Sequence, residues 1–183
     1  MNKLHLGCGK RYLEGYTHID LADFPHIDYK SSIDDLSMLK NNSIDLIYAS
    51  HCFEYFDQEE AKTVLHEWRR VLKKNGVLRL AVPDFEKLIK VYKISNNLKN
   101  ILGPIFGKWN LNDTKNIYHK TIYDRRLLTN LLENNGFHNV VDWDWKKVFI
   151  NHPDYDDHSQ AYYPHMDKEN GILISLNLEC KKF

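Results

Sequence analysis

Hydrophobic positions along the chain switch repeatedly between a strand-like and a helix-like spacing. Short apolar runs bounded by polar or turn residues predict strands, and the run at 44–49 has the continuous apolar character of a parallel strand buried on both faces. Strands that alternate with helices in this way are typical of an α/β sheet protein. The predicted strands are 4–6, 17–21, 29–33, 44–49, 77–82, 140–148 and 171–180.

Apolar residues spaced three and four apart predict helices at three places. The segment 57–76 is the clearest of these, because its apolar positions fall on one face and Asp57 with Glu60 has the form of a capping box. Two further helices are expected to begin after Asp84 and after Asp124, whose carboxylates can cap them.

Two segments show neither spacing. The first, 95–120, contains Gly103 and Pro104, so an irregular insertion is expected there. The second, 150–170, is acidic and aromatic and is expected to form a lid-like loop. The chain is therefore predicted to be a single domain, 1–183, that carries this insertion and this loop.

Composition limits the class of protein. Of 183 residues, 43% are hydrophobic and 27% are charged, and 25 basic residues balance 25 acidic ones, which excludes a disordered or strongly basic chain. A neutral chain favours a small-molecule or carbohydrate partner over nucleic acid. No apolar run is long enough for a membrane helix, and the beginning of the sequence has no signal-like apolar region, so no membrane association and a cytoplasmic location are expected.

The three cysteines form no Cys-x-x-Cys pair. Cys8, Cys52 and Cys180 are an odd number, which argues against a disulfide framework and against a zinc site of the usual spacing. Small buried thiols are expected, and no metal site is predicted.

A glycine turn follows the first predicted strand. Gly7, Cys8 and Gly9 end that strand, and Asp20 stands at the end of the second. In an open parallel sheet, glycines let a ligand approach the backbone, and an acid at the tip of the next strand can accept both hydroxyls of a ribose. The pair predicts a nucleotide site, although a sharp bend alone would also explain the glycines.

The glycine turn belongs to a wider series of motifs, in the segments 6–9 with Gly15 and Asp20, 34–36, 43–51 with Glu54, and 67–76. This series resembles the class I methyltransferases that depend on S-adenosylmethionine (SAM), and within them the predicted methyltransferases of surface-polysaccharide gene clusters. The resemblance covers most of the chain and is strong up to about Asp84. It implies a Rossmann-like sheet, mostly parallel with an antiparallel last strand.

The resemblance also implies roles for individual residues. The glycine turn would line the methionine end of SAM, and the acid after the second strand would hold the ribose hydroxyls. An acid and an amide in the next loop would read the adenine edge, and two residues after the fourth strand would face the methionine amino group or the methyl donor. These cofactor-binding residues are Gly7, Cys8, Gly9, Asp20, Asp35, Leu36, Ser50 and His51.

Plainer interpretations of some of these residues remain open. Asp35 could be a turn or capping residue, and His51 could be a buried structural histidine. Glu54 is interpreted as structural rather than catalytic.

One departure from the family pattern concerns the first crossover. Only residues 10–16 separate the glycine turn from the second strand, whereas a crossover helix needs a dozen or more residues. The crossover is therefore predicted to be shortened. Later segments or a second subunit, as in a homodimer, are expected to cover the sheet face that it leaves open.

The leading functional hypothesis is transfer of a methyl group from SAM, with S-adenosylhomocysteine (SAH) as product, to an oxygen or nitrogen nucleophile of a small molecule or carbohydrate. Positioning of the nucleophile can supply much of the acceleration, together with a base for the acceptor proton. One alternative is a non-catalytic module that binds SAM or SAH. A nicotinamide-dependent oxidoreductase is disfavoured, because Tyr12 stands where the third glycine of its fingerprint would be. The candidate bases are His119, His51 and Asp156, with Asp157 and His158 beside the last.

Overall fold

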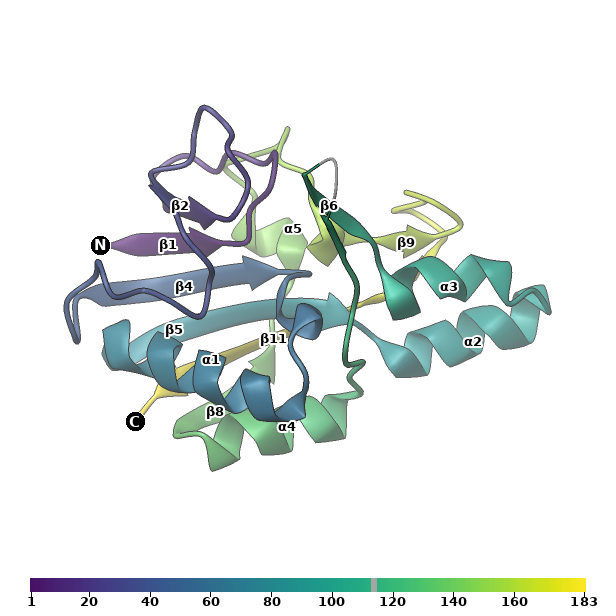
Figure 1. The fold of residues 1–183 in the computed structure, drawn as a ribbon. Helices are drawn as coiled ribbons and strands as arrows, with labels where there is room; N and C mark the ends of the chain where they lie inside the picture. Colours follow the sequence, from purple (N-terminus) through teal and green to yellow (C-terminus); the bar gives the residue numbers. More distant parts are fainter. Residues whose placement is uncertain (113–114) are drawn as a thin grey trace.

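In the computed structural model, which describes residues 1–112 and 115–183, a seven-stranded sheet forms the centre of the protein (Figure 1). Its strands are β1 (Lys3–Leu6), β2 (Thr17–Asp20), β3 (Tyr29–Lys30), β4 (Ile44–Ser50), β5 (Leu72–Pro83), β8 (Phe137–Asp142) and β11 (Ser175–Lys182). The strand order is β3-β2-β1-β4-β5-β11-β8. Strands β1 to β5 pair in parallel, and β11 runs antiparallel to both β5 and β8. The predicted sheet, mostly parallel with an antiparallel last strand, is confirmed.

Helices cover both faces of this sheet. Helices α1 (Gln58–Val71) and α4 (Arg125–Asn134) pack on one face and α5 (Trp145–Val148) packs on the other. Helices α2 (Phe85–Ser95) and α3 (Lys99–Phe106) pack against each other beyond the carboxyl end of β5. The expected capping box at the start of α1 is present, since the Asp57 side chain accepts from the Glu60 amide and the Glu60 side chain accepts from the Asp57 amide. The helix ends earlier than predicted, at Val71, because Leu72 already pairs with Ile44 as the first residue of β5.

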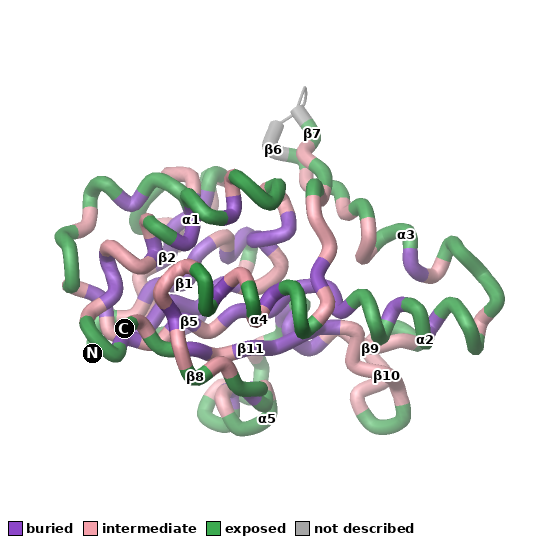
Figure 2. The backbone as a smooth tube through the Cα atoms, turned by 90° about the horizontal axis from the view of Figure 1, so that it is seen from below, coloured by how far each residue is buried: buried purple, intermediate pink, exposed green. Residues whose placement is uncertain are grey.

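The core lies in two layers, one on each side of the sheet. Trp68 of α1 and Leu128 of α4 are buried in one cluster with Ile47 of β4. Tyr48, the next residue of β4, points to the opposite side and is buried with Trp143. Figure 2 shows the buried strands running between α1 on one side and α5 on the other. Consecutive residues of β4 are thus buried on alternate sides of the sheet, which explains why the strand is apolar at consecutive positions.

The crossover from β1 to β2 contains no helix, which confirms the predicted shortening. Turns at Cys8–Arg11 and Leu13–Tyr16 close it with backbone hydrogen bonds of 3.1 and 3.3 Å. Leu13 is buried against the second layer of the core, which is completed by the segment around α5 through Phe149. A later segment of the same chain therefore covers the face that the short crossover leaves open.

The prediction of an irregular 95–120 segment is wrong for part of its length. It contains α3 and the antiparallel pair β6 (Trp109–Asn112) and β7 (Lys115–Ile117). Helix α3 forms despite its internal Pro104 because Ile101 is buried against Leu88 and Val91 of α2. Tertiary packing therefore overrides the unfavourable local propensity.

Two predicted strands are shorter than expected. Only Tyr29–Lys30 of the segment 29–33 pairs with β2. The segment 140–148 divides, since β8 begins earlier, at Phe137, and ends at Asp142. Asp144 then accepts a hydrogen bond from the Lys146 amide and starts α5. Trp143, Trp145 and Phe149, in and beside this short helix, pack in the second layer of the core.

The 150–170 segment is ordered by its own short elements. These are a 3-10 turn η2 (His158–Gln160) and β9 (Tyr162–Tyr163), which pairs antiparallel with β10 (Ile172–Leu173) just after the segment. Across the described ranges of the chain, none of the helices combines the length and apolar character that crossing a bilayer would require.

Candidate functional site

A cavity of about 690 Å³ opens at the carboxyl ends of β1, β2 and β4. Ligands bind at this edge in open parallel sheets, and the volume lies within the range of small-molecule sites. Six of the predicted cofactor residues line it, namely Gly7, Cys8, Gly9, Asp20, Ser50 and His51. The candidate bases His119 and Asp156 line it as well.

The other two predicted cofactor residues, Asp35 and Leu36, are not part of the cavity lining. The Leu36 amide donates to Glu67 Oε1 at 2.9 Å, so it is already used within the protein. Asp35 is exposed, and hydrogen bonding from Ser37 lowers the pKa of its carboxyl group. The same loop instead contributes Ser32 and Ile33 to the cavity.

The glycine-turn wall of the cavity consists of Gly7, Cys8, Gly9 and Asp20. Gly7 and Gly9 have φ values of +60° and +56°, which disfavour other residues. The buried Asp20 carboxylate accepts from the Gly9 amide at 2.8 Å and from the Ala22 amide at 2.7 Å. Asp20 therefore braces the turn, a contact that sequence reasoning did not predict. Each carboxylate oxygen can accept further hydrogen bonds from a ligand.

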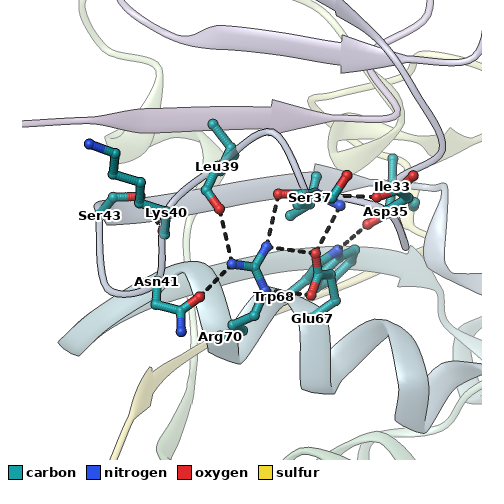
Figure 3. Close-up of polar contacts among 11 residues, drawn as sticks. Ile33, Asp35, Ser37, Leu39, Lys40, Asn41, Ser43, Glu67, Trp68 and Arg70 are labelled. Atoms are coloured by element: carbon teal, nitrogen blue, oxygen red, sulfur yellow. Dashed lines mark hydrogen bonds and ion pairs between the residues drawn. The ribbon is translucent and has the colours of Figure 1, made fainter.

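The loop 31–43, which carries Ser32 and Ile33, is fastened to α1 (Figure 3). Trp68 Nε1 donates to the Ile33 carbonyl at 2.7 Å. Arg70 donates to the Leu36 and Leu39 carbonyls at 2.8 and 2.9 Å while pairing with Glu67. This pairing with the Arg70 guanidinium lowers the pKa of Glu67. The charged residues of α1 thus position one side of the cavity.

Two buried polar atoms of the cavity lining have no hydrogen-bond partner among the described residues. These are Ser50 Oγ and His5 Nδ1. An unsatisfied buried polar atom is costly, and a polar ligand is one way to satisfy it. Together with the carboxylate of Asp20, these atoms fit a ligand that carries hydroxyl and amino groups.

Three histidines of the cavity lining, His51, His119 and His158, form a second part that we call the histidine wall. His51 has a φ of +51° and its Nε2 lies 2.9 Å from Ser175 Oγ. Its ring centroid is 5.3 Å from that of His158. Burial lowers the pKa of all three imidazoles, so they are neutral at pH 7 and able to accept a proton.

Glu54 lies behind this wall in the 3-10 turn η1 (Phe53–Tyr55). It is 0% exposed, and neither carboxyl oxygen has a hydrogen-bond partner among the described residues. Its Oε1 is 3.6 Å from His51 Nδ1 and 3.6 Å from His119 Nε2. Burial raises the pKa of Glu54 to about 8. Sequence reasoning treated Glu54 as structural, and the three-residue spacing from His51 was the one signal that could have linked them.

The lid-like loop is anchored by Asp157. Its Oδ2 accepts from the hydroxyls of Tyr48 and Tyr155, and its Oδ1 accepts from the amide and hydroxyl of Ser159 at 2.8 and 2.6 Å. With these four hydrogen bonds, Asp157 holds the loop on the sheet. Asp156 also lines the cavity, and its half-exposed carboxylate lies 3.2 Å from Lys168 Nζ.

Trp109 reaches the cavity from β6. A Cβ atom placed on Gly9 would lie 2.9 Å from Trp109 Cη2, so the indole rests against the glycine turn. The Trp109 indole therefore forms part of the cavity wall. In the part of the chain that the structure describes, no group of three or more His, Cys, Asp or Glu residues is arranged to hold a metal ion.

Comparison with known proteins agrees with this architecture. Residues 19–80 match the sequence model of a family described as a methyltransferase domain. A solved SAM-dependent methyltransferase from Methanosarcina mazei has a TM-score of 0.59 and 15% identity, covering 100% of this chain and 92% of its own. Another, from Archaeoglobus fulgidus, has a TM-score of 0.56 and 16% identity, covering 99% and 86%.

The fold is that of the class I methyltransferases. A third structure with this fold is the 1,6-didemethyltoxoflavin-N1-methyltransferase of Burkholderia thailandensis, solved with SAH bound, which has a TM-score of 0.57 and 13% identity over 98% of this chain and 70% of its own. Among curated proteins, an uncharacterized methyltransferase-like protein of Schizosaccharomyces pombe is 36% identical over 93 residues, or 47% of this chain. The chain spans about a third (34%) of the length of that relative.

Proposed function

We propose that this protein is an enzyme that transfers a methyl group from SAM to an oxygen or nitrogen atom of a small-molecule or carbohydrate acceptor. The observation that carries the proposal is the meeting of the glycine turn, the buried Asp20 carboxylate and the unpartnered Ser50 Oγ at one cavity on the carboxyl edge of the sheet. The methyltransferase fold and the family match at residues 19–80 support it.

The residues present fit SAM. The glycine-turn wall would receive the methionine end, and Asp20 would accept from the ribose hydroxyls with the lone pairs that its two backbone donors leave free. Ser50 and His51 would face the amino group or the methyl donor. Because the Leu36 amide is bonded to Glu67, we assign the adenine edge to the nearby Ser32 and Ile33 in place of Asp35 and Leu36.

When bound, SAM supplies a methyl group that is already activated by the sulfonium charge. The protein then has to orient the acceptor in line with that methyl group, exclude water and take up the acceptor proton. Trp109 provides an apolar surface for a sugar or another flat acceptor. The neutral imidazoles of His51 and His119 are better placed as proton acceptors than Asp156, whose carboxylate pairs with Lys168 near the surface.

Calorimetric titration tests the cofactor assignment. Saturable binding of SAH with no response to NAD is expected, because the crossover after the glycine turn has no helix N-terminus to receive a pyrophosphate. Binding of NAD without binding of SAH would overturn the proposal. Incubation with isotope-labelled SAM and a panel of alcohols, amines and sugars then identifies the acceptor class. SAH binding without label transfer to any of them would favour the non-catalytic module.

A further inference from the structure

Helices α2 and α3 form a hairpin that stands apart from the central sheet. Residues 96–98 join them, and they run antiparallel beyond the carboxyl end of β5 (Figure 1). Leu88 and Val91 of α2 are buried with Ile101 of α3, so the contact between the helices is apolar. Figure 2 shows the same pair projecting from the molecule, with much of its length exposed. We call residues 85–106 the α2–α3 hairpin.

Large apolar side chains gather on the outer faces of this hairpin. Among the described residues, more than a third of the large apolar side chains that are exposed come from this segment, which is about an eighth of the chain. Single exposed apolar residues are ordinary, whereas a group of them marks a surface that binds something. The members of the group are Phe85, Ile89, Tyr92, Ile94, Leu98, Leu102 and Phe106.

Six of these side chains fall on two stripes. An α-helix turns by about 100° per residue, which places Phe85, Ile89 and Tyr92 on one face of α2. By the same spacing, one face of α3 carries Leu98, Leu102 and Phe106. Each stripe lies about a quarter turn from the buried residues of its helix, in the same rotational sense. Because the helices are antiparallel and face each other, both stripes lie on the same side of the hairpin.

Lysines border the two stripes. The hairpin contains four lysines and only one acid, Glu86, although the whole chain has no net charge. Lys93 and Lys99 follow the stripes of α2 and α3 on the side away from the partner helix. In the part of the chain that the structure describes, no acid forms an ion pair with any of the four. The lysines, all exposed, are Lys87, Lys90, Lys93 and Lys99.

Apolar side chains in the middle and lysines at the edge match the headgroup region of an anionic bilayer. There the apolar groups enter the acyl boundary, and the lysines extend to the lipid phosphates. A second copy of the chain fits this surface less well, because a symmetric contact would set the lysines of one copy against those of the other. The charge of the hairpin therefore favours a lipid surface as its partner.

We propose that the α2–α3 hairpin binds the surface of anionic phospholipid bilayers, with its two apolar stripes between the headgroups and its lysines against their phosphates. Gly103 and Pro104 of the same hairpin line the cavity, as does Gly107 directly after it. Binding would therefore place the cavity next to the lipid surface. The inference goes beyond the proposed function and does not depend on methyl transfer.

The sequence predicted no membrane association because it contains no apolar run long enough to cross a bilayer. A helix that lies in the interface needs an apolar face rather than an apolar run, so that pattern does not test for it. In the hairpin, the exposed apolar positions alternate with lysines along the chain, and only the helical conformation gathers them into stripes.

Co-sedimentation of the full chain with lipid vesicles tests the proposal. One set of vesicles contains phosphatidylcholine alone, and the other contains equal parts of phosphatidylcholine and phosphatidylglycerol. We expect binding to the mixed vesicles to be at least about 10-fold stronger, and to weaken as added salt screens the lysines. Absence of binding to the mixed vesicles, or equal binding to both sets, would overturn the proposal.

The double variant Leu98→Asn with Phe106→Asn removes exposed apolar area from α3 and leaves the buried Ile101 in place. Its binding to the mixed vesicles should fall about 10-fold or more. Leu127→Asn is the matched control, because Leu127 is an exposed leucine on α4, and its binding should stay within about twofold of wild type. Thermal unfolding confirms that each variant is folded. Equal losses of binding in the two proteins would refute the role of the hairpin.

The double variant Lys93→Gln with Lys99→Gln tests the charge. Each lysine near an anionic surface contributes about fivefold in affinity, so binding should weaken about 10-fold to 30-fold and depend less on salt. Lys62→Gln with Lys74→Gln removes two exposed lysines from α1 and β5 and should bind within about twofold of wild type. Equal binding by the two double variants would refute the electrostatic part of the proposal.

Sedimentation equilibrium without lipid examines the second copy as the occupant. We expect the oligomeric state of the double variant Leu98→Asn with Phe106→Asn to equal that of wild type. A wild-type dimer that this variant abolishes, together with no binding to the mixed vesicles, would assign the surface to a second copy and overturn the proposal. A protein that binds the mixed vesicles but not SAH would refute the proposed function and leave this inference standing.

Discussion

The glycine-turn wall is held by backbone amides and one carboxylate from residues close together in the chain, whereas the histidine wall is held by side chains brought from distant segments. Gly9 and Asp20, eleven positions apart, are joined by a single 2.8 Å hydrogen bond. His51 and His119 each lie 3.6 Å from Glu54 Oε1, and His158 comes from the lid-like loop.

This difference has a functional meaning. A cofactor that is the same in every enzyme of a class can be bound by a short, local arrangement of backbone and one acid. An acceptor that varies must be bound by loops whose sequences vary, and the chemistry on that side depends on how those loops pack. The two walls should therefore respond differently to substitution.

Gly7→Ala should produce the largest effect, a loss of about 2 to 5 kcal/mol in the free energy of unfolding. The new Cβ would lie 2.5 Å from Cys52 Cβ, in a residue whose φ is +60°. Gly15→Ala is the matched control, because Gly15 has a φ of +79° but open space around it, so only about 1 to 2 kcal/mol of backbone strain is expected. Urea denaturation measures both, and equal losses would show that the contact with Cys52 is unimportant.

Asp20→Asn should weaken SAH binding by about 1.5 to 3 kcal/mol, because hydrogen bonds to a charged acceptor have that strength. Asparagine has one acceptor oxygen for the two backbone donors, the amides of Gly9 and Ala22. The variant should therefore also lose free energy of unfolding, but less than Gly7→Ala loses. Calorimetry compares the SAH affinity of this variant with that of Asp23→Asn, because the Asp23 side chain is exposed. Equal affinity in the two variants would remove the ribose role from Asp20.

Glu54→Gln should remove a pH dependence of the free energy of unfolding that this buried carboxyl group creates. The pKa of Glu54 is about 8 in the folded protein and 4.5 ordinarily, so between these values the folded state holds a proton that the unfolded state has lost. Its stabilising contribution is complete below pH 4.5 and is lost as pH rises to about 8. Between these pKa values the free energy of unfolding should fall by at most about 1.4 kcal/mol per pH unit.

The window from pH 6.5 to 8 isolates this slope. The lowered pKa values of His51 and His119 act below their ordinary value of 6.5, where acid destabilises the fold because the unfolded state binds the extra protons. Urea denaturation at several pH values in this window should show wild type losing stability as pH rises and Glu54→Gln staying level. Parallel slopes for the two proteins would mean that Glu54 is ionised throughout.

Asp156→Ala should have the smallest effect, below about 0.5 kcal/mol in stability, since its partner Lys168 is a partly exposed lysine and surface ion pairs contribute little. Methyl transfer should stay within about twofold of wild type. Histidine-wall variants measured in the same assay supply the comparison. A loss of activity above tenfold in Asp156→Ala would return the role of base to the lid-like loop.

Local signals were enough to predict the sheet, the capping box at Asp57 and the cavity positions of Gly7 and Asp20. Hydrophobic spacing and capping chemistry act over a few residues, so they can be read directly along the chain. The α3 helix was missed because Pro104 is unfavourable locally and is outweighed by burial of Ile101 against α2. The loop contacts of Leu36 were missed because Glu67 and Arg70 reach it from another element.

The sequence by itself determined the fold class and the acid and glycines that face the proposed cofactor, since each depends on backbone geometry and on spacing within one crossover. Only the tertiary structure decided the state of Glu54. Its burial, and the two imidazoles that lie 3.6 Å from it, come from segments that the chain places around residues 51 and 119. Burial and charge are properties of the assembled environment, so the same glutamate in a solvated turn would be an ordinary ionised carboxylate.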